Sequence, residues 1–219
     1  MVQISVIVPA FNEEERIAHT LKAIRSLPFS LELIVVDDGS DDNTFSIANR
    51  YADEVIQLKE NQGKGRALEA GFHKGKGEYI LCLDADLGST AKEAEALIQP
   101  ALLAEADVIV SKVAPGKKAG FGLVKKRAQA LIFEKTGVKL EAPLSGQRIF
   151  HRQWLPCIQS IHSARFGVET EMSIRFLEAG AKILEIETKM QHREMGKSIK
   201  GLWHRCKQLL DIERYRKEV

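Results

Sequence analysis

The stretch ISVIVP (residues 4–9), followed by NEEE (residues 12–15) and LELIVV (residues 31–36), sets the pattern of the first half of the chain. The two apolar runs are typical of strands that are buried on both faces. Asn12 is predicted to cap the helix between them, because an Asn followed three residues later by Glu15 favours a helix N-terminus. The resulting strand–helix–strand order is the repeating unit of an α/β fold.

The same alternation continues along the chain. Further strands are predicted at 55–58, 79–83 and 108–110, with helices after Ser40, at 65–74 and at 91–103. Strands that alternate with helices of about 10–15 residues predict a Rossmann-like, mostly parallel sheet flanked by helices. Beyond Val113 we predict helices at 123–135 and 168–178, an extended segment at 144–150 and a strand at 182–190.

Composition excludes several classes of protein. The chain has 219 residues, a formal net charge of +2 and 44% hydrophobic residues. Near-neutral charge argues against a general nucleic-acid binder, and no apolar run reaches the ~20 residues that a membrane span needs. The three separated cysteines suit a reducing compartment. Because the first residues lack the pattern of a signal peptide, we expect a cytoplasmic protein.

Acidic residues follow three of the predicted strands. They are Asn12-Glu13 after the first strand, Asp37-Asp38 after the second and Asp84-Ala85-Asp86 after the fourth. The carboxyl ends of parallel strands meet at one edge of a sheet, where ligands bind. Asp84 and Asp86 there fit Mg²⁺ or Mn²⁺ that also binds a diphosphate. The alternative is a solvated turn in which Asp86 caps the next helix.

Two further features lie at the same predicted edge. The carboxylate of Asp38 can accept a hydrogen bond from the ring N–H of a nucleotide base; the alternative is a turn that leads into a helix cap at Ser40. NQGKGR (residues 61–66) opens a helix with two glycines, a Lys and an Arg, so its backbone can approach a diphosphate closely. It has neither Walker nor GxGxxG spacing, and alone it is equally consistent with a glycine-rich helix start.

VIVPAFNEEERI, VVDDGSDDNT, NQGKGRAL and LDADLG occur in this order at successive strand ends. They resemble the ordered motifs of family 2 glycosyltransferases with the GT-A fold, including dolichyl-phosphate sugar synthases, closely over residues 3–90. The resemblance implies a UDP- or GDP-sugar donor and a divalent metal, Mg²⁺ or Mn²⁺. The donor-binding residues that it implies are Pro9, Ala10, Asn12, Glu13, Asp38, Lys64, Asp84 and Ala85.

The same resemblance implies a metal site. It assigns the metal to Asp86 and Asp84, with Asp86 as a catalytic residue. His192 follows the predicted strand at 182–190, where a histidine completes the metal site of glucosyl-3-phosphoglycerate and mannosylglycerate synthases. A neutral imidazole is a suitable ligand beside two carboxylates. The alternative for His192 is a structural histidine.

PLSGQR (residues 143–148) resembles the acceptor segment of dolichyl-phosphate sugar synthases and glucosyl-3-phosphoglycerate synthases, and FGVE (residues 166–169) resembles the latter. Both kinds of relative glycosylate acceptors that carry a phosphate. The acceptor-binding residues implied are Ser145, Gly146, Gln147, Arg148 and Glu169.

Two of these residues have definite expected roles. Arg148 is expected to bind a phosphate bidentately, the alternative being a surface ion pair. Glu169 is expected to be catalytic, orienting or deprotonating the acceptor hydroxyl, the alternative being a helix N-terminal acid. Lipid-phosphate synthases usually carry an Asp three positions before the Ser of this motif, where this chain has Ala142. The neighbouring Glu141 is expected to face elsewhere.

We therefore expect a metal-dependent hexosyltransferase with a phosphate-bearing small or polyprenyl-type acceptor. A single GT-A domain is predicted over residues 1–196, with a nucleotide-sugar half at 1–112 and an acceptor half at 113–196. Residues 197–219 predict a basic amphipathic helix that packs on the domain or contacts an anionic membrane. The alternatives are a non-catalytic sugar-nucleotide-binding or membrane-surface module, or a nucleotidyltransferase. The sequence leaves a homo-oligomer open.

Overall fold

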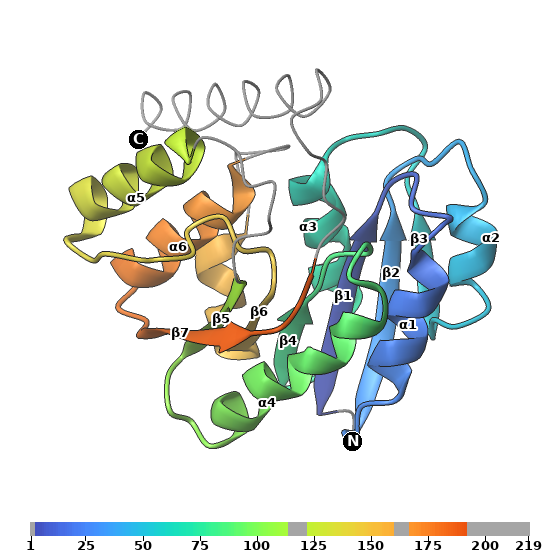
Figure 1. Cartoon of the computed structure of the whole chain (residues 1–219), viewed down its shortest axis with the longest axis horizontal. Coiled ribbons are helices and arrows are strands. Elements are labelled where there is room, and N and C mark those ends of the chain that lie inside the picture. Colours follow the sequence, from blue (N-terminus) through green and yellow to red (C-terminus); the bar gives the residue numbers. More distant parts are fainter. Residues whose placement is uncertain (1–2, 114–121, 160–166, 192–219) are drawn as a thin grey trace.

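The computed structural model describes residues 3–113, 122–159 and 167–191 (Figure 1). Helices cover both faces of one central sheet, and the predicted α/β fold class is confirmed. His192 and the predicted helix at 197–219 lie outside the described residues. None of the helices in the described ranges combines the length and hydropathy that a membrane span requires.

The central sheet has seven strands in the order β3-β2-β1-β4-β6-β5-β7. Their bounds are β1 Ile4–Ala10, β2 Leu31–Asp37, β3 Glu54–Gln57, β4 Tyr79–Cys82, β5 Val108–Val113, β6 Arg148–His151 and β7 Ile183–Thr188. Each predicted strand is present. The extended segment at 144–150 contributes a strand only from Arg148 onward.

The directions of the strands bring residues from the two predicted halves of the chain to the same edge of the sheet. Strands β1 to β4 run parallel, so their carboxyl ends share one edge of the sheet. Strand β6 is antiparallel to both β4 and β5 and lies between them. Its first residue, Arg148, pairs with Cys82 at the end of β4. The loop before β6 therefore lies beside Asp84, and one sheet joins both halves; the boundaries at residues 112 and 196 stay predictions.

The helices and 3₁₀ helices pack on the sheet in two layers. Their bounds are α1 Ile17–Arg25, α2 Thr44–Ala48, α3 Lys64–Lys74, η1 Gly88–Ala94, α4 Glu95–Leu102, α5 Leu123–Thr136, η2 Arg152–Ile158 and α6 Val168–Glu178. Alternate residues of β1 face opposite layers: Val6 packs in the cluster with α1 and α4, and Ile7 packs with α3. Helix α6 covers the latter face, and α5 packs on α6 (Figure 1).

The predicted helices at 65–74, 123–135 and 168–178 are confirmed to within one residue. The helix predicted at 91–103 is divided into η1 and α4. Both predicted helix caps are wrong. Helix α1 begins at Ile17 rather than after Asn12, and α2 begins at Thr44 rather than after Ser40.

Candidate functional site

The side chains that were predicted as caps instead join the loops after β1 and β2. The main-chain N–H of Asn12 donates to the hydroxyl of Ser40 at 2.9 Å. The main-chain N–H of Asp41 in turn donates to the side-chain Oδ1 of Asn12 at 2.9 Å. The amide of Glu13 donates to Oγ1 of Thr44 at 2.8 Å. Reciprocal bonds of this kind satisfy backbone groups that a helix cap would otherwise have served. The two loops after these strands therefore behave as one unit.

Asp38 fastens the end of β2 to the start of α3. Its carboxylate is buried, and each oxygen accepts one main-chain N–H, from Gln62 and from Gly63, both at 2.8 Å. Gly39 has φ +72°, and a Cβ there would lie 2.6 Å from the carbonyl carbon of Glu60. Only glycine fits this turn. Asp38 thus shapes the 61–63 loop, and its contact with a nucleotide base stays a prediction.

A cluster of charged and polar side chains forms where β4, α3, α6 and the loop before β6 meet. We call Lys64, Asp84, Gln147 and Glu169 the Lys64 cluster. The ammonium of Lys64 lies 2.6 Å from Oδ1 of Asp84 and 2.6 Å from Oε1 of Glu169. Lys64 is the first residue of α3, Asp84 follows β4, and Glu169 lies in the first turn of α6. The structure thus brings three predicted site residues together.

Electrostatics holds the ammonium of Lys64 in its charged form. Burial disfavours the charge, but the attraction and hydrogen bonds of Asp84 and Glu169 outweigh that effect and raise the pKa of Lys64 above its ordinary value. The nearby Cys82 behaves in the opposite way, because burial raises the pKa of its thiol to about 12. At neutral pH the ammonium of Lys64 is therefore charged, and the thiol of the neighbouring Cys82 is neutral.

Gly146 lets the backbone pass directly over the Lys64 cluster. A Cβ at this position would lie 2.5 Å from the ammonium of Lys64 and 2.8 Å from Oδ1 of Asp84. The next residue, Gln147, is buried and donates from its amide to Oδ2 of Asp84 at 2.6 Å. Ser145 donates to the amide oxygen of Gln147 at 3.2 Å. These three predicted acceptor residues thus enclose the carboxylate of Asp84.

Arg148 lies inside the protein, and its alternative assignment as a surface ion pair is wrong. Its side chain is 1% exposed. The guanidinium donates to the carbonyls of Ser145 at 2.5 Å and Glu169 at 3.3 Å. Burial lowers the pKa of Arg148, while the charge of Glu169 opposes that shift. Arg148 therefore ties the loop before β6 to the start of α6, and direct binding of an acceptor phosphate stays a prediction.

Asp84 and Asp86 supply hard oxygen donors of the kind that Mg²⁺ and Mn²⁺ accept. Within the described ranges, no three His, Cys, Asp or Glu side chains gather into a metal-binding group. Magnesium commonly takes one or two carboxylates and completes its shell with phosphate oxygens and water. Asp84, whose carboxylate lies beside Lys64, and Asp86, two residues further along the turn, supply carboxylates in that number. The third predicted ligand, His192, falls outside the described residues.

Two residues that sequence analysis missed, Thr20 of α1 and Arg16 just before it, hold the turn containing Asp86. Thr20 is buried, donates to the carbonyl of Ala85 at 2.7 Å and accepts the amide of Gly88 at 2.8 Å. The guanidinium of Arg16 donates to the carbonyl of Asp86 at 3.1 Å. Thr20 falls within the apolar stripe of its helix, and a hydroxyl in such a stripe is the signal that could have indicated it.

Glu141 points away from the Lys64 cluster, as expected. Its carboxylate lies 3.0 Å from the ammonium of Lys112, and this pairing with Lys112 lowers the pKa of Glu141. Main-chain amides of Glu141 and Ala142 both donate to Glu185 on β7. The missing Asp at Ala142 is therefore not replaced by its neighbour.

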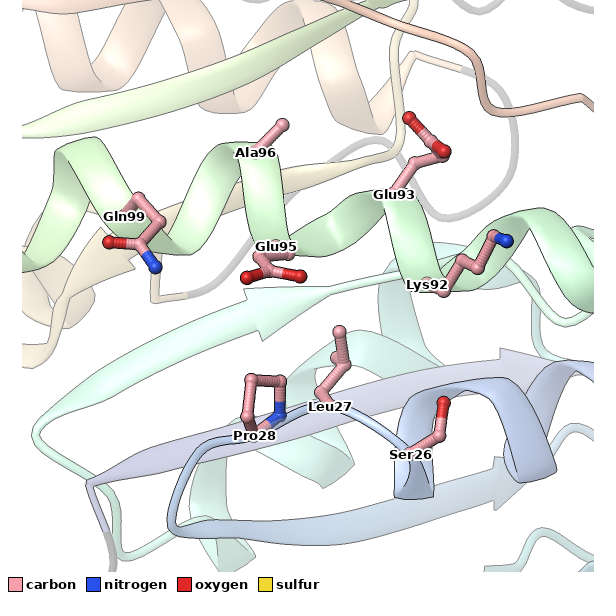
Figure 2. A pocket seen from close by; sticks show the side chains of 8 residues that line it. All are labelled: Ser26, Leu27, Pro28, Lys92, Glu93, Glu95, Ala96 and Gln99. Carbon is pink, nitrogen blue, oxygen red and sulfur yellow. The ribbon is translucent and has the colours of Figure 1, made fainter.

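An open groove of about 570 Å³ lies elsewhere, between the end of α1 and the helices η1 and α4 (Figure 2). Its lining residues are Ser26, Leu27, Pro28, Lys92, Glu93, Glu95, Ala96 and Gln99. None of them belongs to the predicted site. The groove is therefore separate from the predicted site residues at the carboxyl edge of the sheet.

Residues 5–156 match the family described as glycosyl transferase family 2. The chain is similar to an undecaprenyl-phosphate 4-deoxy-4-formamido-L-arabinose transferase of Photorhabdus laumondii, with 30% identity over 207 residues, 90% of this chain and 62% of the relative. It is also 37% identical over 111 residues to the human dolichyl-phosphate beta-glucosyltransferase, 43% of this chain and 34% of the relative. The chain thus spans less than two thirds of these relatives.

Solved structures show the same fold. Glucosyl-3-phosphoglycerate synthase of Mycobacterium tuberculosis, in complex with Mn²⁺, UDP and glucosyl-3-phosphoglycerate, matches with a TM-score of 0.76 and 25% identity, over 98% of this chain and 79% of that one. The complex of the same enzyme with Mg²⁺ and UDP gives a TM-score of 0.78 at 24% identity, over 98% and 79%. The expected GT-A-type fold is therefore confirmed, and the chain belongs to glycosyl transferase family 2.

Proposed function

We propose that this chain transfers a hexose from a UDP- or GDP-sugar to an acceptor that carries a phosphate, with the help of a divalent metal. One observation carries the proposal: Lys64 joins Asp84 of the predicted donor half to Glu169 of the predicted acceptor half at 2.6 Å each. Donor and acceptor residues must meet at one point for group transfer, since proximity supplies much of the rate gain. Family membership supports this reading.

The donor side of the proposed site consists of α3 and the turn after β4. Lys64 lies in the first turn of α3, where main-chain N–H groups and the helix dipole favour an anion such as a diphosphate. Asp84 and Asp86 would hold the metal, together with His192 if it lies nearby. When bound, the metal would neutralise charge on the departing nucleoside diphosphate.

The acceptor side of the proposed site begins at α6. The side chain of Glu169 is 12% exposed, so its carboxylate is partly desolvated but still reachable. It would orient the acceptor hydroxyl or take its proton as the new glycosidic bond forms. The named relatives act on undecaprenyl phosphate and dolichyl phosphate, and a structural relative was crystallised with glucosyl-3-phosphoglycerate. These names support a phosphate-bearing acceptor here.

A donor screen on the wild-type chain tests this function. UDP-glucose, UDP-galactose, UDP-glucuronate and GDP-mannose are each added with Mn²⁺, with Mg²⁺ or with EDTA, and the melting temperature is recorded. We expect one donor at about 100 times its Kd to stabilise the fold by about 2.7 kcal/mol, or roughly 5–10 °C, only when metal is present. The sugar 1-phosphates serve as controls.

Turnover separates an enzyme from a binding module. The stabilising donor is incubated with 3-phosphoglycerate or with a polyprenyl phosphate in detergent, and products are identified by mass spectrometry. We expect a glycosylated phosphate-bearing product and slow donor hydrolysis without acceptor. If the donor binds but neither reaction occurs, the chain is a sugar-nucleotide-binding module. If no donor binds with either metal, the proposed function is wrong.

A further inference from the structure

The backbone of Gln147 is bonded to β5, and its side chain is bonded to Asp84 and Ser145. Its main-chain carbonyl accepts the amide of Ser111 on β5 at 2.9 Å, which fixes it against the sheet. Its side chain is buried, with the amide nitrogen 2.6 Å from Oδ2 of Asp84. Its amide oxygen accepts the hydroxyl of Ser145, so both ends of the side chain are occupied. A buried side chain bonded at both ends, on a backbone that is itself bonded to β5, has little freedom to leave for a ligand.

The amide of Gln147 is a hydrogen-bond donor to Asp84 that carries no charge. Lys64 takes Oδ1 of this carboxylate and Gln147 takes Oδ2, so the plane of the carboxylate is fixed from both sides. An amide donor fixes orientation without removing the negative charge on which a cation or the Lys64 ammonium depends. Outer partners of this kind keep a ligating carboxylate in position.

We propose that Gln147 is a positioning residue for Asp84 and not a contact for the acceptor. Ser145 orients the amide of Gln147, and the amide orients the carboxylate that faces the donor. The loop before β6 thereby positions Asp84 of the proposed donor site, although the sequence of this loop resembles an acceptor segment. The kinetic consequence of this inference rests on the proposed function, whereas its structural consequence does not.

The structural consequence is tested by a double-mutant cycle that needs no ligand. Gln147→Met keeps the volume of the side chain but removes the donor, and Asp84→Ala removes the acceptor. Unfolding midpoints in urea are measured for the wild type, both single variants and the double variant. We expect the Gln147→Met shift to fall by at least half in the Asp84→Ala background, because contacting residues are energetically coupled. Additive shifts would overturn the inference.

The kinetic consequence is tested in the metal dependence. Replacing a residue that orients a metal-ligating carboxylate typically weakens metal binding about 10- to 100-fold, so Gln147→Met should raise the half-saturating Mn²⁺ concentration for donor binding by about 10-fold. The acceptor KM should stay within twofold of the wild type. Gln129→Met is the matched control, because the amide of Gln129 donates to the carbonyl of Leu140, at 2.8 Å, and not to a residue of the Lys64 cluster. A raised acceptor KM with unchanged metal dependence would show that Gln147 contacts the acceptor instead.

A second inference concerns the outer face of α5. This helix buries Val124, Ala128, Leu131 and Ile132 against its neighbours. It nevertheless also carries large apolar side chains on the outside, with Leu123 63% and Phe133 48% exposed. Leu123, Lys126, Ala130 and Phe133 recur at helical spacing on that exposed face. Helix α5 is therefore apolar on two sides, which is unusual for a helix that faces only water.

Charge accompanies these exposed apolar side chains. Residues 123–139 contain five basic side chains and a single acid. Lys125, Lys126 and Lys139 are exposed, and the ammonium of Lys139 lies 5.4 Å from the ring centre of Phe133. Exposed apolar side chains and neighbouring lysines offer two kinds of contact with an anionic bilayer, the former with the acyl boundary and the latter with the headgroups. Figure 1 shows α5 on the outer side of α6, the helix that carries Glu169.

We propose that the outer face of α5, formed by Leu123, Lys125, Lys126 and Phe133, docks on an anionic membrane surface. Each basic residue near such a surface adds about 1 kcal/mol of attraction, which salt screens. The apolar side chains would then enter the headgroup region. This orientation would place α6, on which α5 packs, near the bilayer.

Vesicle sedimentation tests the docking surface on the full chain. The wild type should pellet with vesicles of phosphatidylglycerol and phosphatidylcholine at low salt, and with pure phosphatidylcholine at least fivefold less. Either Leu123→Ser with Phe133→Ser, or Lys125→Glu with Lys126→Glu, should lower binding at least fivefold. Leu103→Ser is the control, because Leu103 is 71% exposed at the end of α4, away from α5.

Two outcomes would overturn this second inference. Either the wild type fails to bind anionic vesicles, or the α5 variants bind as well as the wild type does, which would place the contact elsewhere, for example in residues 197–219. Size-exclusion chromatography of the same variants shows whether the patch holds a second copy of the chain. A loss of self-association without a loss of vesicle binding would assign the patch to a dimer instead.

Discussion

Replacing Lys64 with Met is expected to lower sugar transfer by about 10²- to 10³-fold. The ammonium is the cation shared by Asp84 and Glu169, at 2.6 Å from each, and its raised pKa keeps it charged throughout the neutral range. Hydrogen-bond donors and charged groups that are held in place at a reaction centre typically contribute a rate factor of this size. Without the ammonium, two partly buried carboxylates face one another, and the diphosphate that we propose to bind at the start of α3 would lose a nearby cation.

The readout must separate a loss of chemistry from a loss of fold. We expect Lys64→Met to retain a cooperative unfolding transition while donor affinity and kcat both fall. Lys74→Met is the matched control on the same helix, because its exposed ammonium pairs with Glu54 at 3.1 Å on the surface. Surface pairs of that kind contribute about 0–1 kcal/mol, so the control should retain full activity. Activity of Lys64→Met within threefold of the wild type would contradict the assigned role.

Strand order explains how much of the site could be predicted from sequence. Asp37, Asp38, Asp84 and Asp86 each follow an apolar run, and parallel strands deliver their carboxyl ends to one edge. That argument needs only periodicity and chain order. It placed Asp84 and Lys64 at the same edge, where the structure has them paired.

The partners of the buried polar groups could not be predicted in the same way. The resemblance of PLSGQR (residues 143–148) to an acceptor segment predicts that Gln147 and Arg148 contact the acceptor. Strand β6 inserts antiparallel between β4 and β5, and this placement buries both side chains. No periodicity signals such an insertion. The helix caps failed for a related reason, since Asn12 and Ser40 found partners in each other's loops, 28 residues apart.

Replacing Arg148 with Met is expected to produce the largest loss of stability among these substitutions. The guanidinium is buried and donates to the carbonyls of Ser145 and Glu169, and its Nε has no hydrogen-bond partner among the described residues. Met retains most of the apolar stem but leaves both carbonyls without this donor. An unsatisfied buried polar group costs about 1–3 kcal/mol.

The local balance of charge adds to that cost. Arg148 and Lys64 together balance Asp84 and Glu169, so removal of Arg148 leaves an excess negative charge near the buried end of β4. We expect the free energy of unfolding to fall by about 3 kcal/mol, which corresponds to a melting temperature roughly 6–12 °C lower for a chain of this size.

Arg66→Met is the matched control for Arg148→Met, because Arg66 is exposed and pairs with Glu69 on the surface of α3. Its unfolding free energy should stay within about 0.5 kcal/mol of the wild type. Urea unfolding of both variants checks the comparison. Burial works against Arg148, since it lowers the pKa of the guanidinium, so a wild-type midpoint for Arg148→Met would mean that relief of this desolvation offsets the lost hydrogen bonds. That result would contradict the prediction that Arg148 contributes net stability to the fold.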